Sequence, residues 1–182
     1  GTQRWRVLVY FSALGLAFLF LEIAFIQKFV LFLHHPLYAV AVVLTAFLLF
    51  AGAGSFYSQR LVRTGSAVSV AVAAIAVASV VYLLALDRLL APFASLADSL
   101  RILVSVALIA PLAFFMGLPF PLGITRVGQR TPELIPWAWG INGCASVISA
   151  VLATLLAMHF GFTVVVVSAV LLYGVAAVSL PR

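Results

Sequence analysis

The chain has 182 residues, of which 66% are hydrophobic and only 8% are charged, with a net charge of +6. Soluble domains are about 45–50% apolar and about 25% charged, so this composition excludes an ordinary soluble domain as well as a disordered chain. We therefore expect an all-α, polytopic integral membrane protein in which residues 1–182 form a single transmembrane domain.

Six apolar segments have lengths that suit helices crossing the roughly 30 Å of bilayer hydrocarbon. They cover residues 7–33, 37–57, 66–86, 102–118, 137–159 and 163–180. Pro36 separates the first two segments, Pro119 and Pro121 end the fourth, and Gly161 predicts a tight turn between the last two. We expect six transmembrane helices packed as one bundle.

Two connections have patterns of their own. In residues 88–100, apolar and polar side chains fall on different helical faces, which predicts a short helix lying in the outer interface. Residues 119–136 contain four prolines and two glycines, so we expect a cytosolic loop that is irregular or only briefly helical. As the longest polar stretch, this loop is the best surface for a soluble partner.

The distribution of Lys and Arg predicts the orientation, because cytoplasmic loops are enriched in both. With six spans and a cytosolic N-terminus, seven basic residues lie on the cytosolic side and three on the outer side. The seven are Arg4, Arg6, Arg60, Arg63, Arg126, Arg130 and Arg182, and the three are Lys28, Arg88 and Arg101. Trp5, Trp137 and Trp139 then all lie at the cytosolic interface, where tryptophan is enriched. Both observations predict an N-in/C-in topology.

Several classes of site are not expected. The basic residues form no run interleaved with aromatics, so we expect no nucleic-acid binding. The single cysteine, Cys144, excludes an internal disulfide and a cysteine-based metal site. His34 and His35 diverge on a helix and have no third ligand nearby, so no metal is expected. Without a nucleotide loop, paired carboxylates or a Ser/His/Asp set, the chain offers no cofactor site and no self-contained catalytic site.

Glu22 is the strongest candidate for an intramembrane functional residue, and Gln27 is a second. Glu22 lies about 15 residues into its helix, roughly 22 Å from the cytosolic end at 1.5 Å per residue. An ionisable group at this depth costs at least about 2.5–3.5 kcal/mol on insertion scales. Either Glu22 is functional, or it is a protonated structural group bonded within the bundle, where Pro111 frees a backbone carbonyl. We expect Lys28 to extend towards the outer headgroups rather than pair with Glu22.

Small residues mark two candidate helix-packing faces. Gly140 and Gly143 belong to a face with three- and four-residue spacing in residues 137–149, and Gly52 and Gly54 lie near the end of the second helix. Such faces let helices approach closely. Asn142 is expected either to hydrogen-bond across such a contact or to line a cavity, which makes it a third candidate for an intramembrane functional residue.

Four motifs resemble those of a known family. They are residues 21–33 with His35-Pro36, Gly52-Ala-Gly-Ser55 with Ser58 and Arg60, Met116-Gly-Leu-Pro-Phe-Pro-Leu-Gly123, and Pro136-Trp-Ala-Trp-Gly-Ile-Asn-Gly-Cys-Ala-Ser146. Together they resemble the transmembrane domain of bacterial spermidine synthase-like (aminopropyltransferase-like) membrane proteins. The resemblance covers most of the chain, and its third and fourth motifs are the most specific.

The resemblance implies a membrane module of the bacterial cytoplasmic membrane, in contact with lipid and with a soluble Rossmann-type aminopropyltransferase-like domain on its cytosolic face. The soluble enzymes transfer an aminopropyl group from decarboxylated S-adenosylmethionine to a diamine. That domain is absent here and is expected before Gly1, so no catalytic or cofactor-binding residue is carried over. The alternative is a small transporter or channel for an amine, a product or a lipid that uses Glu22. An intramembrane lipid enzyme ranks last, and the oligomeric state stays open.

Overall fold

The computed structural model describes residues 2–62 and 64–181, and these contain no β-strand. The helices are α1 (Thr2–Leu33), α2 (Pro36–Leu61), α3 (Ala67–Leu90), α4 (Asp98–Met116), α5 (Pro119–Arg130) and α6 (Ile135–Ser179), with short 3₁₀ helices η1 (Ala91–Phe93) and η2 (Pro132–Leu134). Within the described residues, five helical stretches are long and apolar enough to cross a membrane, and α4 and α5 together form one of them. The all-α expectation is therefore confirmed. Arg63 and Arg182, two of the basic residues counted above, lie outside the described residues, as does Gly1.

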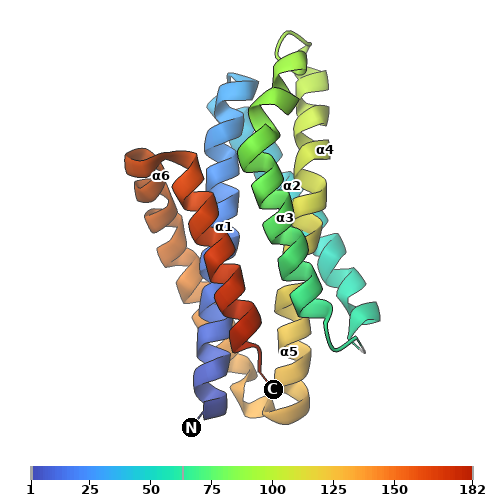
Figure 1. Cartoon of the computed structure of the whole chain (residues 1–182), viewed down its shortest axis with the longest axis vertical. Helices are drawn as coiled ribbons and strands as arrows, with labels where there is room; N and C mark the ends of the chain where they lie inside the picture. The colour runs from blue at the N-terminus through green and yellow to red at the C-terminus, as the bar shows by residue number, and fades with distance from the viewer. Residues whose placement is uncertain (1, 63, 182) are drawn as a thin grey trace.

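The helices run side by side along the long axis of the molecule (Figure 1). Of the five stretches, α1 is the most deeply buried and α6 the least. One face of α1 carries large apolar side chains in the core, including Phe11, Phe25 and Phe29, all fully buried. Because this helix packs against α6 along its length and also contacts α2, α4 and α5, it is the central element of the bundle.

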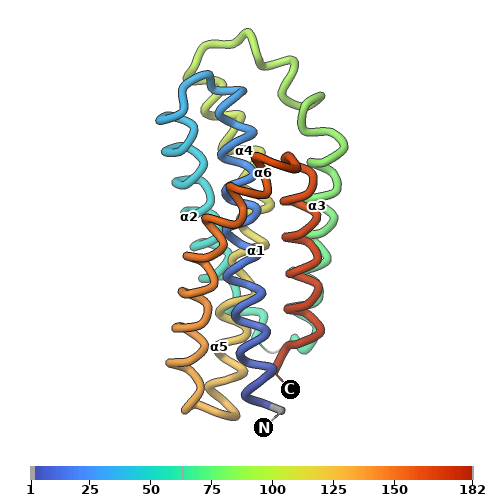
Figure 2. Tube along the Cα trace, turned by 90° about the vertical axis from the view of Figure 1, so that its left-hand side faces the viewer, coloured from blue at the N-terminus to red at the C-terminus, as the bar shows by residue number. Residues whose placement is uncertain are grey.

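The long helix α6 folds back on itself at Gly161, as Figures 1 and 2 show. This glycine has φ 80° and ψ 177°, a conformation that is open essentially only to glycine. The tight turn expected here is confirmed. α6 thus contains both of the apolar segments expected over 137–159 and 163–180, as two antiparallel halves covering residues 135–160 and 162–179.

The separate interfacial helix expected over residues 88–100 is wrong. Instead, α3 continues to Leu90, η1 follows, and α4 begins at Asp98. Pro92 lies in the first turn of η1, where it cannot donate the hydrogen bond that would continue α3. Arg101 of α4 links this connection to the end of α1, because it donates hydrogen bonds to the carbonyl oxygens of Leu96 and Phe32, each at 3.1 Å.

The irregular loop expected over residues 119–136 is also wrong, because α5 makes most of it helical. Pro119 and Pro121 lie in the first turn of α5, where backbone N–H groups lack helical partners in any case. Gly123 faces the ring of Tyr10 on α1, and a β-carbon there would overlap that ring. Tyr10 also donates a hydrogen bond of 2.6 Å to the carbonyl of Pro119. These contacts pack α5 against α1.

One end of the bundle carries most of the described basic residues. Thr2, the end of α2, α5 and Ser179 all lie at this end (Figure 1). We call it the arginine end, after Arg4, Arg6, Arg60, Arg126 and Arg130. Lys28, Arg88 and Arg101 lie towards the opposite end, where α3 and α4 are connected.

Candidate functional site

Glu22 lies in the middle of α1 and is only 5% exposed. One of its carboxyl oxygens, Oε1, is buried and has no hydrogen-bond partner among the described residues. A buried polar group without a partner costs free energy, and the cost is larger when the group is charged. The structure therefore places an ionisable, unsatisfied group inside the bundle, and a purely structural role would require a partner that it does not have here.

The surroundings of Glu22 are aromatic. Phe18 and Phe25 lie one helical turn before and after it, so they share its face of α1. Both rings contact Phe47 of α2, with centroid distances of 6.1 and 5.7 Å. Phe25 also contacts the ring of Tyr82 on α3 at 5.5 Å. The face of α1 that carries Glu22 therefore packs against aromatic side chains, and Glu22 itself is only 5% exposed.

The nearest basic residue along α1 is engaged elsewhere. Lys28 Nζ lies 2.6 Å from Asp87 Oδ1 of α3 and 5.6 Å from the ring centroid of Phe162. Lys28 therefore pairs with the carboxylate of Asp87 and not with Glu22. The backbone carbonyl that Pro111 leaves free, that of Ala107 four residues earlier, does not serve Glu22 either, because Glu22 forms no hydrogen bond with another described residue. Glu22 thus has no hydrogen-bond or ion-pair partner among the described residues.

Gln27 does not join Glu22 in one site. The two residues are five positions apart, which turns their side chains by about 140° around the helix axis. Gln27 is half-buried and forms no hydrogen bond with any other residue that the structure describes. It therefore remains a separate candidate on another face of α1.

A cavity of about 360 Å³, which we call the central cavity, lies between α1, α2, the α4–α5 junction and α6. Its polar lining comes from Ser55, Asn142, Ser146 and Tyr173, and its apolar lining includes Phe18. Since Phe18 precedes Glu22 by one turn, the cavity begins about one turn below the buried carboxyl group. This volume falls within the range of small-molecule sites, about 300–1,000 Å³.

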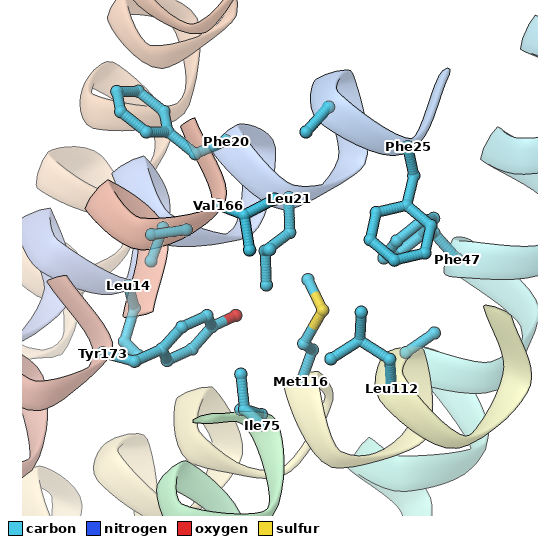
Figure 3. Close-up of a cluster of buried hydrophobic side chains, with 14 of the residues drawn as sticks. Leu14, Phe20, Leu21, Phe25, Phe47, Ile75, Leu112, Met116, Val166 and Tyr173 are labelled. Atoms are coloured by element: carbon cyan, nitrogen blue, oxygen red, sulfur yellow. The ribbon is translucent and has the colours of Figure 1, made fainter. Parts of the chain in front are cut away.

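Tyr173, on the second half of α6, is the most deeply buried polar residue of the central cavity. It is 1% exposed, and its hydroxyl forms no hydrogen bond with another described residue. Figure 3 shows this hydroxyl pointing into the middle of the buried cluster, towards Leu21 and Met116. Nothing in the sequence pattern distinguished Tyr173, because a tyrosine in an apolar segment looks like any other core aromatic.

Asn142 does both things expected of it, because it bonds across a helix contact and also lines the cavity. Its Nδ2 donates a hydrogen bond of 3.0 Å to the carbonyl of Phe11 on α1. Ser149, two turns further along α6, donates a hydrogen bond of 2.7 Å to the carbonyl of Leu16. Interhelical bonds of this kind stabilise membrane bundles by about 0.6 kcal/mol on average. Together they hold α6 against α1 at the cavity wall.

A second cavity, of about 450 Å³, extends from the central cavity towards the arginine end. The two share Gly52, Ser55, Phe120 and Pro121, and the second adds the polar side chains of Ser58, Gln59 and Thr125. The absence of a side chain at Gly52 leaves the space between them open. The two cavities therefore adjoin, and we call the pair the passage; its lining is both polar and apolar.

The candidate packing glycines divide into two groups. A β-carbon on Gly54 would overlap the backbone of Phe114 on α4, so Gly54 lies at a close α2–α4 crossing. Gly52, Gly140 and Gly143 have nothing within 4 Å of such an atom, so the packing role predicted for these three is wrong within this chain. The close α1–α6 crossing uses Gly15 instead, which faces the backbone of Asn142.

Among the described residues, no group of three or more His, Cys, Asp or Glu side chains could hold a metal ion. No protein family, curated protein or solved structure matches this chain.

Proposed function

We propose that this chain is the membrane module of a spermidine synthase-like protein, in which it anchors and partners a soluble Rossmann-type aminopropyltransferase-like domain. The observation that carries the proposal is the arginine end. It combines both ends of the described chain, the amphipathic helix α5 and the exposed side chains of Trp5, Trp137 and Trp139. A soluble domain tethered on this side would meet Gln129, Arg130 and Glu133, which are all exposed.

The proposed topology is six membrane passes, with the arginine end in the cytosol of a bacterial cell and the chain in its cytoplasmic membrane. The fold-back of α6 at Gly161 supports six passes, because each half then crosses separately. The excess of described basic residues at the arginine end, five against three, supports its cytosolic placement.

Cysteine labelling tests this topology in intact bacterial cells. In a Cys144→Ser background, Gln129→Cys places a thiol at the arginine end and Ser95→Cys places one at the opposite end; both positions are exposed. A membrane-impermeant maleimide should label only Ser95→Cys before the cells are permeabilised, and both variants afterwards. Labelling of Gln129→Cys in intact cells would contradict the proposed orientation.

The mass of the native protein in its source membrane tests the partnership. The mass should lie well above the 19.4 kDa of this chain, or a soluble aminopropyltransferase-like protein should copurify with it. The intact assembly should release methylthioadenosine in the presence of a diamine and decarboxylated S-adenosylmethionine. Glu133→Lys at the arginine end should weaken this activity more than Ser95→Lys at the opposite end. A free chain with no copurifying enzyme would contradict the proposal.

A transport function is the second candidate, and the unpartnered carboxyl group of Glu22, about one helical turn from the central cavity, specifically favours it. A carboxylate without a protein cation is suited to meet a cationic amine, and ionisable groups inside membranes often mark substrate pathways. The passage from the central cavity to the arginine end supplies polar side chains for such a path.

Flux of labelled putrescine into liposomes that contain the purified chain tests the transport candidate. We expect flux that Glu22→Gln, a substitution of nearly equal size, reduces to the rate of empty liposomes. Glu133→Gln, which removes an exposed carboxylate at the arginine end, should leave it unchanged. Flux by the unmodified chain no faster than in empty liposomes would exclude putrescine transport.

A further inference from the structure

A third cavity, of about 350 Å³, lies at the arginine end, between α5, the connection before α3 and the end of the described chain. Its polar lining comes from Arg126, Gln129 and Arg130 of α5 and from Thr64. We call it the arginine cavity. It is separate from the passage described above, since neither of the two cavities that form the passage shares a residue with it.

Two guanidinium groups share the arginine cavity. Arg126 and Arg130 are four residues apart on α5, so they project from the same face of the helix. Arg126 is held in place by a hydrogen bond of 2.8 Å to the carbonyl of Gly65. Like charges at this spacing repel one another, and the arrangement is therefore unfavourable unless an anion lies between or beside them.

No carboxylate of the described chain neutralises this pair. The described ion pairs are Lys28–Asp87 and Arg101–Asp98, both towards the opposite end. Glu22 is buried within the bundle, and Glu133 lines a different cavity together with Arg4. The arginine cavity therefore has two positive charges and, among the described residues, no acidic group in its lining.

The position of the cavity matches the level of lipid headgroups. The stretch from Asp98 to Arg130 has 33 residues, or about 50 Å of helix at 1.5 Å per residue. Because bilayer hydrocarbon is only about 30 Å thick, the stretch is longer than the hydrocarbon, and its charged end, with Arg126 and Arg130, favours the headgroup level. The cavity wall also includes the apolar side chains of Val62, Val68 and Leu122, which a free inorganic ion would not use.

We propose that the arginine cavity binds the phosphate group of an anionic phospholipid. Guanidinium groups bind phosphate oxygens through paired N–H donors, and the Gln129 amide and the Thr64 hydroxyl provide further donors in the same lining. The apolar wall then contacts the glycerol and the first carbons of the acyl chains. Basic pockets between helices at a membrane surface are known to hold acidic lipid headgroups, which fits this chemistry.

Native mass spectrometry of the purified full chain in a nonionic detergent tests this proposal. Titration with phosphatidylglycerol and with phosphatidylcholine of the same acyl chains should show tighter binding of the anionic lipid. Arg130→Gln should weaken that binding about fivefold, which corresponds to about 1 kcal/mol for one arginine near the surface. Arg130 is exposed and forms no hydrogen bond with another described residue, so this variant should fold. The double variant Arg126→Gln/Arg130→Gln should weaken binding further.

The matched control is Arg60→Gln, which removes the same charge at the same end of the bundle but outside the cavity. Its affinity for phosphatidylglycerol should equal that of the unmodified chain. Equal losses in Arg60→Gln and Arg130→Gln would overturn the proposal, because they would indicate diffuse surface attraction. Equal affinity for the two lipids, or displacement of phosphatidylglycerol by inorganic phosphate at matched concentration, would likewise overturn the assignment to a phospholipid.

Discussion

At the scale of single residues, glycines of similar spacing have very different surroundings. Gly54 and Gly117 lie where the backbones of α2 and α4 touch, and a β-carbon on either would overlap the facing backbone. Gly52 lies two residues before Gly54, and its missing side chain only leaves a cavity open. Spacing alone predicts a small-residue face, but the direction of the neighbouring helix decides which glycine is required.

We predict that Gly54→Ala destabilises the protein and that Gly52→Ala does not. The added methyl of Gly54→Ala must push α4 away, because the overlapping atom is the backbone carbonyl oxygen of Phe114 rather than a flexible side chain. Such overpacking costs about 1–3 kcal/mol. Gly52→Ala meets no atom within 4 Å and should stay within about 0.5 kcal/mol of the unmodified protein. Reversible unfolding in mixed detergent measures both, and equal effects would show that the α2–α4 crossing is looser than described.

For Glu22, the sequence predicted burial but not which residues surround the side chain. Its place in a long apolar segment predicted an unusual buried carboxyl group, and the structure confirms the burial. The carbonyl freed by Pro111 does not serve as its partner, and Lys28 pairs with Asp87 of α3 rather than with Glu22, as expected. Partners on another helix depend on which helices are neighbours, and one chain segment does not contain that information.

At the scale of helices, arginine side chains satisfy the carbonyl groups that remain free at helix ends. Arg6 of α1 donates hydrogen bonds to the carbonyl oxygens of Val178 and Leu180 at the end of α6, at 3.1 and 3.0 Å. Arg101 does the same for Phe32 at the end of α1. The last four carbonyls of a helix have no partner within it, and a positive charge there also opposes the helix dipole.

We predict that Arg6→Gln loosens the end of α6. Loss of the guanidinium group removes all three of its hydrogen bonds to Val178 and Leu180 and a favourable charge, an effect of about 0.3–1 kcal/mol for a charge at a helix end. Hydrogen exchange of the amides in residues 174–180 should therefore speed up by up to about fivefold. Arg4→Gln is the control, because Arg4 is exposed and forms no hydrogen bond with another described residue. Equal exchange in the two variants would contradict the capping role of Arg6.

The helix α5 was not predicted from the sequence, which indicated a loop in its place. Four prolines and two glycines in residues 119–136 indicated a loop. However, two of these prolines fall in the first turn of α5, where proline is tolerated, and Gly123 fits against Tyr10. Composition counts proline as a helix breaker wherever it stands, whereas its effect depends on its position within the helix.

At the scale of the whole molecule, the path of the chain depends on the turn at Gly161. The added β-carbon in Gly161→Ala would meet no other atom, so its effect is confined to the backbone. We predict that this substitution costs about 1–3 kcal/mol, because an alanine is strained at φ 80° and ψ 177°. It should lower the free energy of unfolding measured in mixed detergent.

Gly174→Ala is the matched control on the same helix. It lies in a regular helical region and meets nothing within 4 Å, so its higher helix propensity should leave stability unchanged or raise it by up to about 1 kcal/mol. If Gly161→Ala behaved like Gly174→Ala, the reversal of α6 would not require a glycine.

The sequence by itself determined that the chain is apolar and all-α, and it determined approximately where several of its helices begin and end. An apolar content of 66% excludes a soluble domain, and the positions of Pro36, Pro119 and Gly161 mark helix limits that the structure reproduces to within a few residues. These conclusions depend only on local composition and on backbone restrictions, which act within a few residues.

Only the tertiary structure decided which side chains meet. It placed Tyr173 beside Asn142 in the central cavity, paired Lys28 with Asp87 and brought Arg126 against the connection before α3. The physical reason is that most segments of this chain are apolar on nearly all sides, so their hydropathy shows no strong preference for the face that is buried. Close backbone approach and a few interhelical hydrogen bonds select the neighbours instead, and these contacts join residues far apart in the chain.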